Sequence, residues 1–308
     1  MDYKTVFLLK SPMFFQQVIN GLTVGGVYAL IALGYTMVYG ILELINFAHG
    51  EIYMIGAYLG IIFLGVFTAL GLTQYSLTLS LLLTFIFSVF FCSAYGFTIE
   101  KLAYKPLRNA PRLSPLISAI GVSIFLQNYV MLTQGATDKV FPHILEVHRL
   151  EFFNATMTTL QVFIIITSLL LMGLLHLFVM KTKTGKAMRA VAQDKVMASL
   201  LGINIDRIIS VTFIIGSGLA AVAGVMVAMY YGLVNYSIGY IVGIKAFAAA
   251  VLGGIGSIPG AILGGFVLGI IESLGASFLS SEYKDAYAFV VLIIILLIKP
   301  KGLMGKSG

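Results

Sequence analysis

The stretch KTKTGKAMRAVAQDKVMASLLGINIDRI, residues 181–208, separates two long apolar runs and carries six Lys/Arg and two Asp. The run before it covers about 159–180, and the run after it covers about 208–232. Both runs reach the roughly 20 apolar residues that a helix needs to cross a bilayer. A basic segment between two such helices is typical of a cytoplasmic loop. This stretch therefore predicts a helical membrane protein.

The composition of the whole chain indicates the same class. Only 10% of the 308 residues are charged, against about 25% in an average soluble domain, and the mean hydropathy is +1.02. Thirteen of the nineteen Lys/Arg lie at 101–112, 181–207 and 299–306, so the net charge of +7 reflects cytoplasmic loops and not a surface for nucleic acid. Cys92 lies alone in an apolar run, where we expect a small buried residue without a disulfide or metal partner.

The basic segments also predict a topology. We expect an all-α polytopic membrane protein, a single transmembrane domain over 1–308, with about nine helices that cross the bilayer. The predicted spans cover about 13–41, 50–70, 77–99, 114–134, 159–180, 208–232, 241–255, 260–279 and 285–298. The stretch 241–255 is short enough to be re-entrant, so eight spans are the alternative. The loop 135–157 has two Lys/Arg against three acids and suits the outer face, with the N-terminus outside and the C-terminus in the cytoplasm.

The basic stretch itself predicts a short amphipathic helix over about 186–203. Gly202, followed by Ile203 and Asn204, indicates where that helix ends. Its apolar positions are Ala187, Met188, Val191, Met197, Leu200 and Leu201. From the residues alone two roles stay open: an interfacial helix that binds anionic lipid, or a docking element for a cytoplasmic partner.

Motifs for catalysis or for a cofactor are not readable in the sequence. A phosphate-binding loop needs G-x-x-x-x-G-K-[ST], but Met180 and Pro300 stand where the first glycine belongs before the two Gly-Lys pairs. The HGE triplet at His49 has no second histidine at the spacing of a metalloprotease. We therefore predict no catalytic residues, no metal site, no cofactor and no enzymatic activity.

Ionisable side chains inside spans are costly in hydrocarbon, and they mark transport pathways or internal pairs. A first group lies in ILELINFAHGEIYM, at the predicted cytoplasmic end of the first two spans, where it would line a gate or form a plain interfacial turn. Its members are Glu43, Asn46, His49 and Glu51. Lys245 and Glu272 lie in two later spans, and we expect them to pair across helices in a structural role.

A second unusual feature is the stretch AAAVLGGIGSIPGAILGG, residues 248–265. An unbroken helix tolerates so many glycines, and a proline, only at a cost. A broken helix at membrane depth lines a cavity or lies within protein, and such breaks recur at transporter substrate sites. Close packing of small residues is the alternative. The candidate pathway residues here are Gly253, Gly254, Gly256 and Pro259.

Four longer blocks resemble the LivH family, the permease subunits of bacterial high-affinity branched-chain amino-acid ABC importers. They are YALIALGYTMVYGILELINFAHGEIYMIGAY (28–58), ISAIGVSIFLQNYV (117–130), MASLLGIN (197–204) and KAFAAAVLGGIGSIPGAILGG (245–265). The likeness extends from about residue 14 to about residue 300. Permeases for urea and short-chain amides share weaker versions of the same blocks, so the family is better defined than the substrate.

The resemblance implies a five-part importer in the bacterial inner membrane. This chain and a LivM-like second permease would form the pathway, two ATP-binding subunits would sit on the cytoplasmic face, and a periplasmic binding protein would deliver leucine, isoleucine or valine. The N-terminus would be periplasmic. The segment 189–204 would be the coupling helix that docks into an ATPase cleft, with Gly202 close-packed. Its docking residues would be Arg189, Gln193, Asp194, Ala198 and Gly202.

Two other classes of protein stay as alternatives. A self-sufficient secondary carrier would use Glu51 or Glu272 for ion coupling. A membrane-embedded enzyme would be built around His49 and Glu51.

Overall fold

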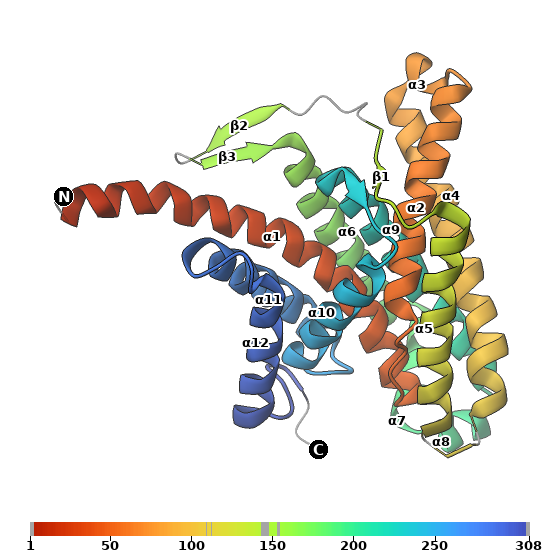
Figure 1. The fold of residues 1–308 in the computed structure, drawn as a ribbon. Coiled ribbons are helices and arrows are strands. Elements are labelled where there is room, and N and C mark those ends of the chain that lie inside the picture. Colours follow the sequence, from red (N-terminus) through yellow and green to blue (C-terminus); the bar gives the residue numbers. More distant parts are fainter. Residues whose placement is uncertain (1–2, 109, 112, 143–147, 153–154, 306–308) are drawn as a thin grey trace.

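The long apolar runs form helices in the computed structural model (Figure 1), because backbone within a bilayer must satisfy its hydrogen bonds internally. The structure describes residues 3–108, 110–111, 113–142, 148–152 and 155–305, with side chains from residue 13 onward. Two of the basic residues counted above, Arg112 and Lys306, lie outside the described residues.

Helices make up nearly all of the regular structure in the described residues, which confirms the all-α class. In chain order they are α1 (Tyr3–Leu42), α2 (His49–Ala69), α3 (Leu72–Tyr75), α4 (Leu77–Ile99), the π-helical turn η1 (Glu100–Tyr104), the 3-10 turn η2 (Lys105–Leu107), α5 (Leu113–Gln134), α6 (Thr159–Lys181), α7 (Lys183–Gln193), α8 (Lys195–Leu200), α9 (Ile205–Tyr231), α10 (Ile238–Gly253), α11 (Ile258–Phe278) and α12 (Lys284–Ile298). The short strands are β1 (Lys139–Val140), β2 (Arg149–Phe152), β3 (Ala155–Thr158) and β4 (Leu233–Val234), with β1 antiparallel to β4 and β2 antiparallel to β3.

Seven helices of the described residues are long and apolar enough to cross a bilayer, and they coincide with seven of the predicted spans. They cover Met13–Leu42, His49–Ala69, Leu77–Leu107, Leu113–Gln134, Thr159–Lys181, Ile205–Tyr231 and Ile258–Phe278. The other two predicted spans correspond to α10 and α12, with 16 and 15 residues. Both are shorter than the roughly 20 residues of a helix that crosses perpendicular to the membrane.

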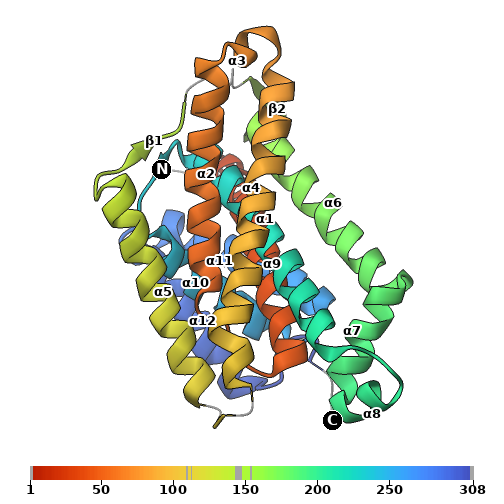
Figure 2. The ribbon, with the colours of Figure 1, turned by 90° about the vertical axis from the view of Figure 1, so that its right-hand side faces the viewer.

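The connections gather at two opposite ends of the bundle. α7, α8, the α4–α5 connection and the C-terminus lie at one end, and α3 with β2 and β3 lies at the other (Figures 1 and 2). The first end carries the three basic segments of the sequence, and we call it the basic end. The second end is built from the loop that was predicted to face outward. The structure therefore separates these loops as the charge pattern predicts.

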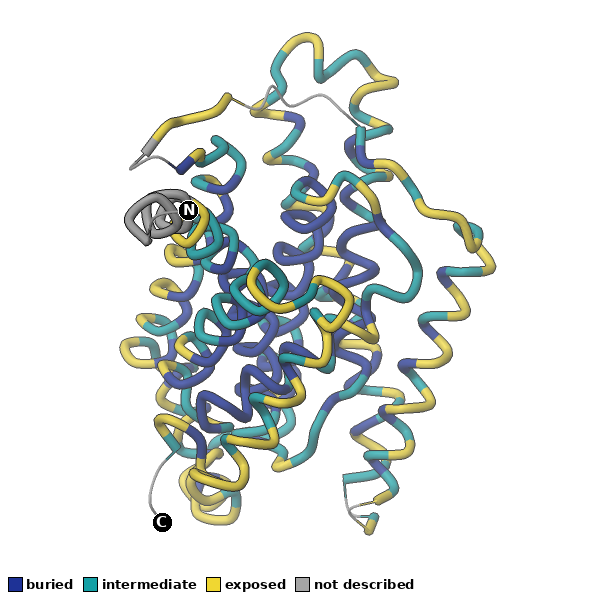
Figure 3. The backbone as a smooth tube through the Cα atoms, turned by 60° about the vertical axis from the view of Figure 1, so that its left-hand side comes forward, coloured by how far each residue is buried: buried dark blue, intermediate teal, exposed yellow. Residues whose placement is uncertain are grey.

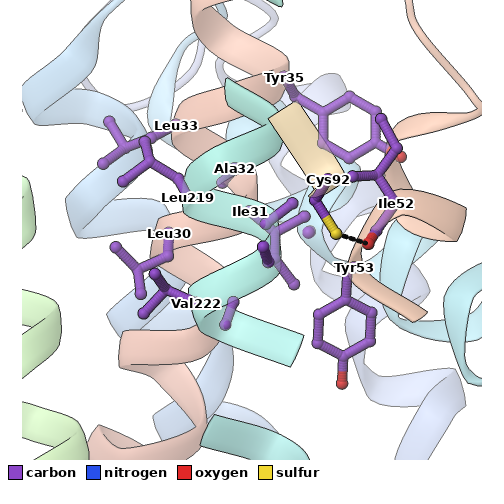
Figure 4. Packing of buried hydrophobic residues seen from close by; sticks show 14 of the residues in the cluster. Leu30, Ile31, Ala32, Leu33, Tyr35, Ile52, Tyr53, Cys92, Leu219 and Val222 are labelled. Atoms are coloured by element: carbon purple, nitrogen blue, oxygen red, sulfur yellow. Dashed lines mark hydrogen bonds between the residues drawn. The ribbon is translucent and has the colours of Figure 1, made fainter. Parts of the chain in front are cut away.

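α1 and α9 form the centre of the bundle. In the most apolar window of each helix, 83% of the α1 residues and 78% of the α9 residues are buried, against 22% in α4 and α5 and 28% in α6. Figure 3 shows this contrast between a buried centre and exposed outer helices. Side chains of α1, α2 and α9 interleave in the close view of Figure 4. There the Cys92 thiol donates to the Ile52 carbonyl at 3.6 Å, and Cys92 is buried as predicted.

α1 and α11 approach through glycines spaced four residues apart on both helices. An added Cβ at Gly265 would lie 2.5 Å from the Cα of Ala29, and one at Gly21 would lie 2.7 Å from the Cα of Ile270. Any larger residue at either glycine would push the two backbones apart. Small residues of this kind allow helices to pack closely in a bilayer, where the hydrophobic effect no longer favours association.

Candidate functional site

The basic stretch 181–208 forms two helices, so the prediction of one helix over 186–203 is wrong. α7 ends at Gln193, because Asp194 adopts an extended conformation with φ −153° and ψ 109°. The Asp194 carboxylate then caps the next helix by accepting a hydrogen bond from the Met197 N–H at 2.9 Å. The carboxylate thus accepts from the Met197 N–H, which in a continuous helix would donate to a backbone carbonyl of the preceding turn.

Gly202 ends α8, as predicted, but it is not close-packed within this chain. Its φ of +80° is a left-handed conformation that favours glycine. The N–H of Ile203 bonds the Ala198 carbonyl at 3.0 Å and the N–H of Gly202 bonds the Ser199 carbonyl at 2.9 Å, a hydrogen-bonded C-terminal cap of the Schellman type. An added Cβ at Gly202 would meet no atom of the chain within 4 Å. The turn therefore requires glycine here, and the expectation that Gly202 packs closely in an ATPase cleft concerns a partner subunit and stays a prediction.

α8 presents an apolar face to the outside at the basic end. Met188 and Val191 of α7 and Ala198 of α8 point inward and are buried. The outward set is more than half exposed and consists of Val196, Met197, Leu200 and Leu201. Three of these had been assigned to the apolar side of a single helix, and they face away from the bundle because the chain turns at Asp194.

Of the predicted docking residues, two face a cavity. Arg189 reaches back toward the end of α6, where its guanidinium donates to the Met180 carbonyl at 3.5 Å, and both Arg189 and Gln193 line a large cavity at the basic end. Asp194, Ala198 and Gly202 have the structural positions described above. Arg189 and Gln193 are therefore exposed side chains of this cavity, and Asp194 is exposed next to them at the end of α7.

The four polar residues predicted at the start of α2 do not converge on one site. Asn46 shapes the turn: its side-chain oxygen accepts from the Ala48 N–H at 3.1 Å and from the Tyr104 hydroxyl at 2.9 Å. His49 is buried with its ring edge-on to Tyr35, the centroids 4.9 Å apart. The Asn46 contacts fit the plain turn that stood as the alternative reading of this group.

Glu51 and Glu43 point to different parts of the bundle. Glu51 is fully buried, and its Oε1 accepts from the Ser123 hydroxyl of α5 at 3.1 Å. Its other oxygen lies against Gly239 of α10. Glu43 ends α1 at φ +59° and lines the large cavity. Glu43 is therefore the member of this group that lines the large cavity at the basic end.

The helix break between α10 and α11 is closed by the C-terminal segment. The N–H groups of Leu303 and Met304 bond the carbonyls of Leu252 and Gly253 at 2.8 and 2.9 Å. Gly254 has φ +104°, and an added Cβ there would lie 2.5 Å from the Gly305 nitrogen. Close packing therefore accounts for Gly254, and for Gly253, whose added Cβ would overlap the backbone of α11.

The remaining two residues of the break, Gly256 and Pro259, line the same large cavity as Glu43, Arg189 and Gln193. This cavity of about 870 Å³ lies between the ends of α1 and α6, the helix α7 and the α10–α11 connection. The segment around Glu43, the basic stretch 181–208 and the glycine-rich stretch 248–265 therefore each contribute residues to this cavity. We call it the inner cavity.

A buried ionic cluster lies away from the inner cavity, and it confirms the predicted pairing of Lys245 with Glu272. The two charged groups are 3.0 Å apart, with side chains 4% and 1% exposed. The Tyr28 hydroxyl donates to Glu272 at 2.9 Å. Lys245 also pairs with Asp285 at 2.5 Å and Glu272 with Lys284 at 3.4 Å. The cluster joins α1, α10, α11 and α12.

A second ionic cluster fastens α4 to α9 at the basic end. Glu100 is fully buried, pairs with Arg108 and with Lys101 at 3.2 Å, and accepts from the Ser210 hydroxyl at 2.9 Å. Arg108 also pairs with Asp206 at the start of α9. Lys101 and Arg108, which were counted above as loop charges, thus help to hold α9 in place.

Sequence reasoning found the Lys245–Glu272 pair but missed the other members of its cluster and the whole second cluster, for which the signals were weak. Lys284 was placed in the connection 280–284 between the last two predicted spans, whereas Lys284 and Asp285 form the first turn of α12. Glu100 and Arg108 lie eight positions apart, at a segment whose positive charge was used only to predict a cytoplasmic loop. Their meeting depends on the π-helical turn η1, which no hydropathy pattern indicates.

A bundle of seven bilayer-length helices around a buried centre, in the described residues, defines a helical membrane protein. Residues 17–296 match the family described as "Branched-chain amino acid transport system / permease component". The chain belongs to this family.

Curated relatives extend the match over nearly the whole length. The high-affinity branched-chain amino acid transport system permease protein LivH of Escherichia coli (strain K12) is 50% identical over 297 residues, 95% of this chain and 96% of the relative. The corresponding protein BraD of Pseudomonas aeruginosa is 50% identical over 298 residues with the same coverage. A probable LivH of Methanocaldococcus jannaschii is 29% identical over 318 residues, 97% of this chain and 96% of the relative. No solved structure matches the chain.

Proposed function

We propose that this chain is the permease subunit of an ABC importer that carries branched-chain amino acids into the cytoplasm. The observation that carries the proposal is the 50% identity to LivH over 95% of the chain, without a difference in length that would alter the bundle. The buried cluster around Lys245 and the inner cavity give this bundle buried polar groups and open space between its helices, as a pathway needs. The chain itself would hydrolyse nothing.

The remaining members of the importer follow from the family. A second, LivM-like permease completes the pathway, two ATP-binding subunits supply the energy, and a periplasmic binding protein delivers leucine, isoleucine or valine. The four outward residues of α8 support docking of an ATP-binding subunit, because exposed apolar groups beyond the bilayer mark contact surfaces between proteins. Arg189 and Gln193 stand beside this face and would contact the same subunit.

The inner cavity would be the exit of the pathway on the cytoplasmic side. Glu43, Gly256 and Pro259 line it and would form its gate with Arg189. The basic end would then face the cytoplasm, with nine crossings, a periplasmic N-terminus and a cytoplasmic C-terminus in the bacterial inner membrane. Movement of α7 and α8 with the ATP-binding subunit would shift the bundle between outward-open and inward-open states.

Reconstitution tests the proposal. The chain is co-expressed with its partner permease and ATP-binding subunits and placed in proteoliposomes, and uptake of labelled leucine is measured with ATP and binding protein. We expect uptake that stops when ATP or the binding protein is omitted. Uptake by the isolated chain, driven by an ion gradient, would show a secondary carrier instead. Uptake of urea or an amide in preference to leucine would move the chain to a related importer.

A further inference from the structure

Two cavities adjoin the Lys245–Glu272 cluster, in the part of the bundle between α1, α9, α10, α11 and α12. One has a volume of about 170 Å³ and is lined mainly by aliphatic and tyrosine side chains, including Val24, Val27 and Val227. The other has about 210 Å³ and is lined by Gln17, Asn20, Ser273 and other small or polar groups. The two share four lining residues, which are Val24, Tyr230, Tyr231 and Lys284.

Charged groups of both signs border the two cavities. Lys245 lines the aliphatic cavity and Glu272 lines the polar one, while Lys284 lines both. With Asp285, whose carboxylate pairs with Lys245, the cluster holds two positive and two negative groups. The Tyr53 side chain is fully buried, its hydroxyl has no partner, and it lines the aliphatic cavity. A buried hydroxyl without a partner is costly unless a ligand or water satisfies it.

We propose that these two cavities form a transient binding site for the zwitterion of an aliphatic α-amino acid. This inference rests on the proposed function and assigns it a place in the bundle. The ammonium group of the ligand binds the Glu272 carboxylate, and its carboxylate binds the Lys284 ammonium. The aliphatic side chain then enters the cavity lined by Val24, Val27 and Val227.

Charge balance selects the zwitterion. The cluster is neutral as it stands, with each lysine close to an acid. A ligand that carries one positive and one negative group can insert between Lys284 and Glu272, which are 3.4 Å apart, without leaving either charge unpaired. A simple anion or cation would leave one uncompensated charge beside the buried Glu272 and Lys245, which is unfavourable.

Volume and lining select the aliphatic side chain. A dry cavity of about 150 Å³ with aliphatic walls holds a molecule the size of benzene, so the aliphatic cavity of about 170 Å³ accommodates the four carbons of a leucine side chain. A polar side chain would meet mostly valine and tyrosine side chains here, and the free Tyr53 hydroxyl would replace only part of its hydrogen bonds to water. Since the ligand must compete with the existing Lys284–Glu272 contact, binding is weak, as release toward the cytoplasm requires.

Photolabelling of the complete importer tests where the ligand binds. The probe is a leucine analogue with a diazirine in its side chain, irradiated on the purified complex with and without excess leucine. We expect leucine-sensitive labels on peptides of α1 around Val24 and of α9 around Val227. Leucine-sensitive labels confined to peptides around Glu43 and Arg189, at the inner cavity, would overturn the site.

A cavity-filling variant gives the functional test. Val227→Phe fills the aliphatic cavity without touching a charge, and we expect leucine uptake to fall at least about tenfold, the low end of steric effects in apolar pockets. Val66→Phe, at a position of α2 that is 46% exposed, is the matched control and should keep wild-type uptake. Uptake by Val227→Phe equal to the control would reject the site while the proposed function stands. Absence of ATP-dependent uptake in the wild-type importer would reject the function itself. If Val227→Phe does not assemble, the photolabelling result on the wild-type complex decides.

Discussion

At the scale of single residues, two glycines of the α10–α11 break share a left-handed backbone but differ in their surroundings. Gly254 and Gly256 have φ of +104° and +90°, and only Gly254 has atoms within 4 Å of an added Cβ, the nearest of them the Gly305 nitrogen. A side chain at either position costs about 1–3 kcal/mol of backbone strain. At Gly254 the clash with the C-terminal segment adds to this strain.

We therefore predict that Gly254→Ala lowers the thermal unfolding temperature more than Gly256→Ala does, measured on the purified complex in detergent. Gly256 lines the inner cavity, so its variant should affect uptake more than stability. Equal losses of stability in the two variants would mean that the C-terminal segment does not hold the break.

Burial distinguishes the ionic pairs of this chain. Lys245 and Glu272 are almost fully buried, and removal of one partner from such a pair costs up to about 3–5 kcal/mol when the other charge stays inside uncompensated. Lys284, 3.4 Å from Glu272, offsets part of this cost. Lys245→Met should therefore destabilise the complex, and Lys245→Met with Glu272→Gln should recover most of the thermal stability. The double variant should not recover uptake if Glu272 binds the ligand.

The pair of Lys105 with Asp206 is the control for this prediction. Its charged groups are 2.7 Å apart, but the side chains are 45% and 47% exposed, and such surface pairs contribute about 0–1 kcal/mol. Lys105→Met should leave the unfolding temperature nearly unchanged. Full uptake by the double variant at the buried pair would assign that pair a structural role only.

At the scale of elements, α8 depends on its cap. It has six residues, far fewer than an isolated helix needs for stability in water, and the Asp194 side chain accepts the Met197 N–H at its start. Loss of a capping side chain costs about 1 kcal/mol. Asp194→Ala should therefore reduce co-purification of the ATP-binding subunit, whereas Asp194→Asn, which keeps an oxygen acceptor, should not.

The outward face of α8 leads to a separate prediction. Val196→Ser with Leu200→Ser removes apolar contact area without touching the bundle, because both side chains are at least 70% exposed. We expect the ATP-binding subunit to dissociate while the unfolding temperature of the permease stays the same. Lys183→Ala with Lys186→Ala removes two positive charges instead, and a larger loss from this pair would favour the lipid-binding role.

The same elements explain what the sequence could predict. Hydropathy located seven spans within a few residues at nearly every end, because apolar length is a local property. The third span is the exception, since η1 and η2 extend α4 to Leu107. The break at Asp194 was missed, because a side chain that competes for a backbone N–H leaves the apolar pattern on either side unchanged.

The candidate sites depended on contacts between distant segments. The pairing of Lys245 with Glu272 was predictable because two opposite charges in hydrocarbon have few other partners. The divergence of Glu43 from Glu51 was not, because it depends on where α5 supplies Ser123 and where α10 supplies Gly239. Nor does the sequence indicate that α7 and the α10–α11 connection line one cavity.

At the scale of the whole molecule, α1 connects the two candidate regions. Its residues Val24, Val27 and Tyr28 line the aliphatic cavity, and Tyr39, Gly40 and Glu43 line the inner cavity. Between them lies a segment without solvent exposure, which covers residues 29–33. Since this packed segment separates the cavities, transport requires a change in the packing of α1 against its neighbours, and a rigid bundle would hold the ligand on one side.

The orientation of the bundle is testable with cysteines, because the one native thiol is silent. Cys92 is fully buried, so a membrane-impermeant maleimide should report only introduced cysteines. Ala110→Cys and Ser199→Cys lie at the basic end and should react only in inside-out vesicles of the importer. Thr137→Cys lies at the opposite end and should react in intact spheroplasts. The reverse pattern would place the basic end in the periplasm and remove the proposed cytoplasmic exit.

Whether α10 crosses the bilayer is decided by the loop between α11 and α12. If α10 crosses despite its 16 residues, α11 returns outward and Ser281, exposed in that loop, faces the periplasm. If α10 re-enters on the outer side, α11 runs inward and Ser281 faces the cytoplasm. The antiparallel approach of α1 and α11 favours a full crossing by α10, because α1 ends at the basic end and α11 starts there (Figure 1). We therefore expect Ser281→Cys to react in intact spheroplasts, and reaction only in inside-out vesicles would leave eight crossings.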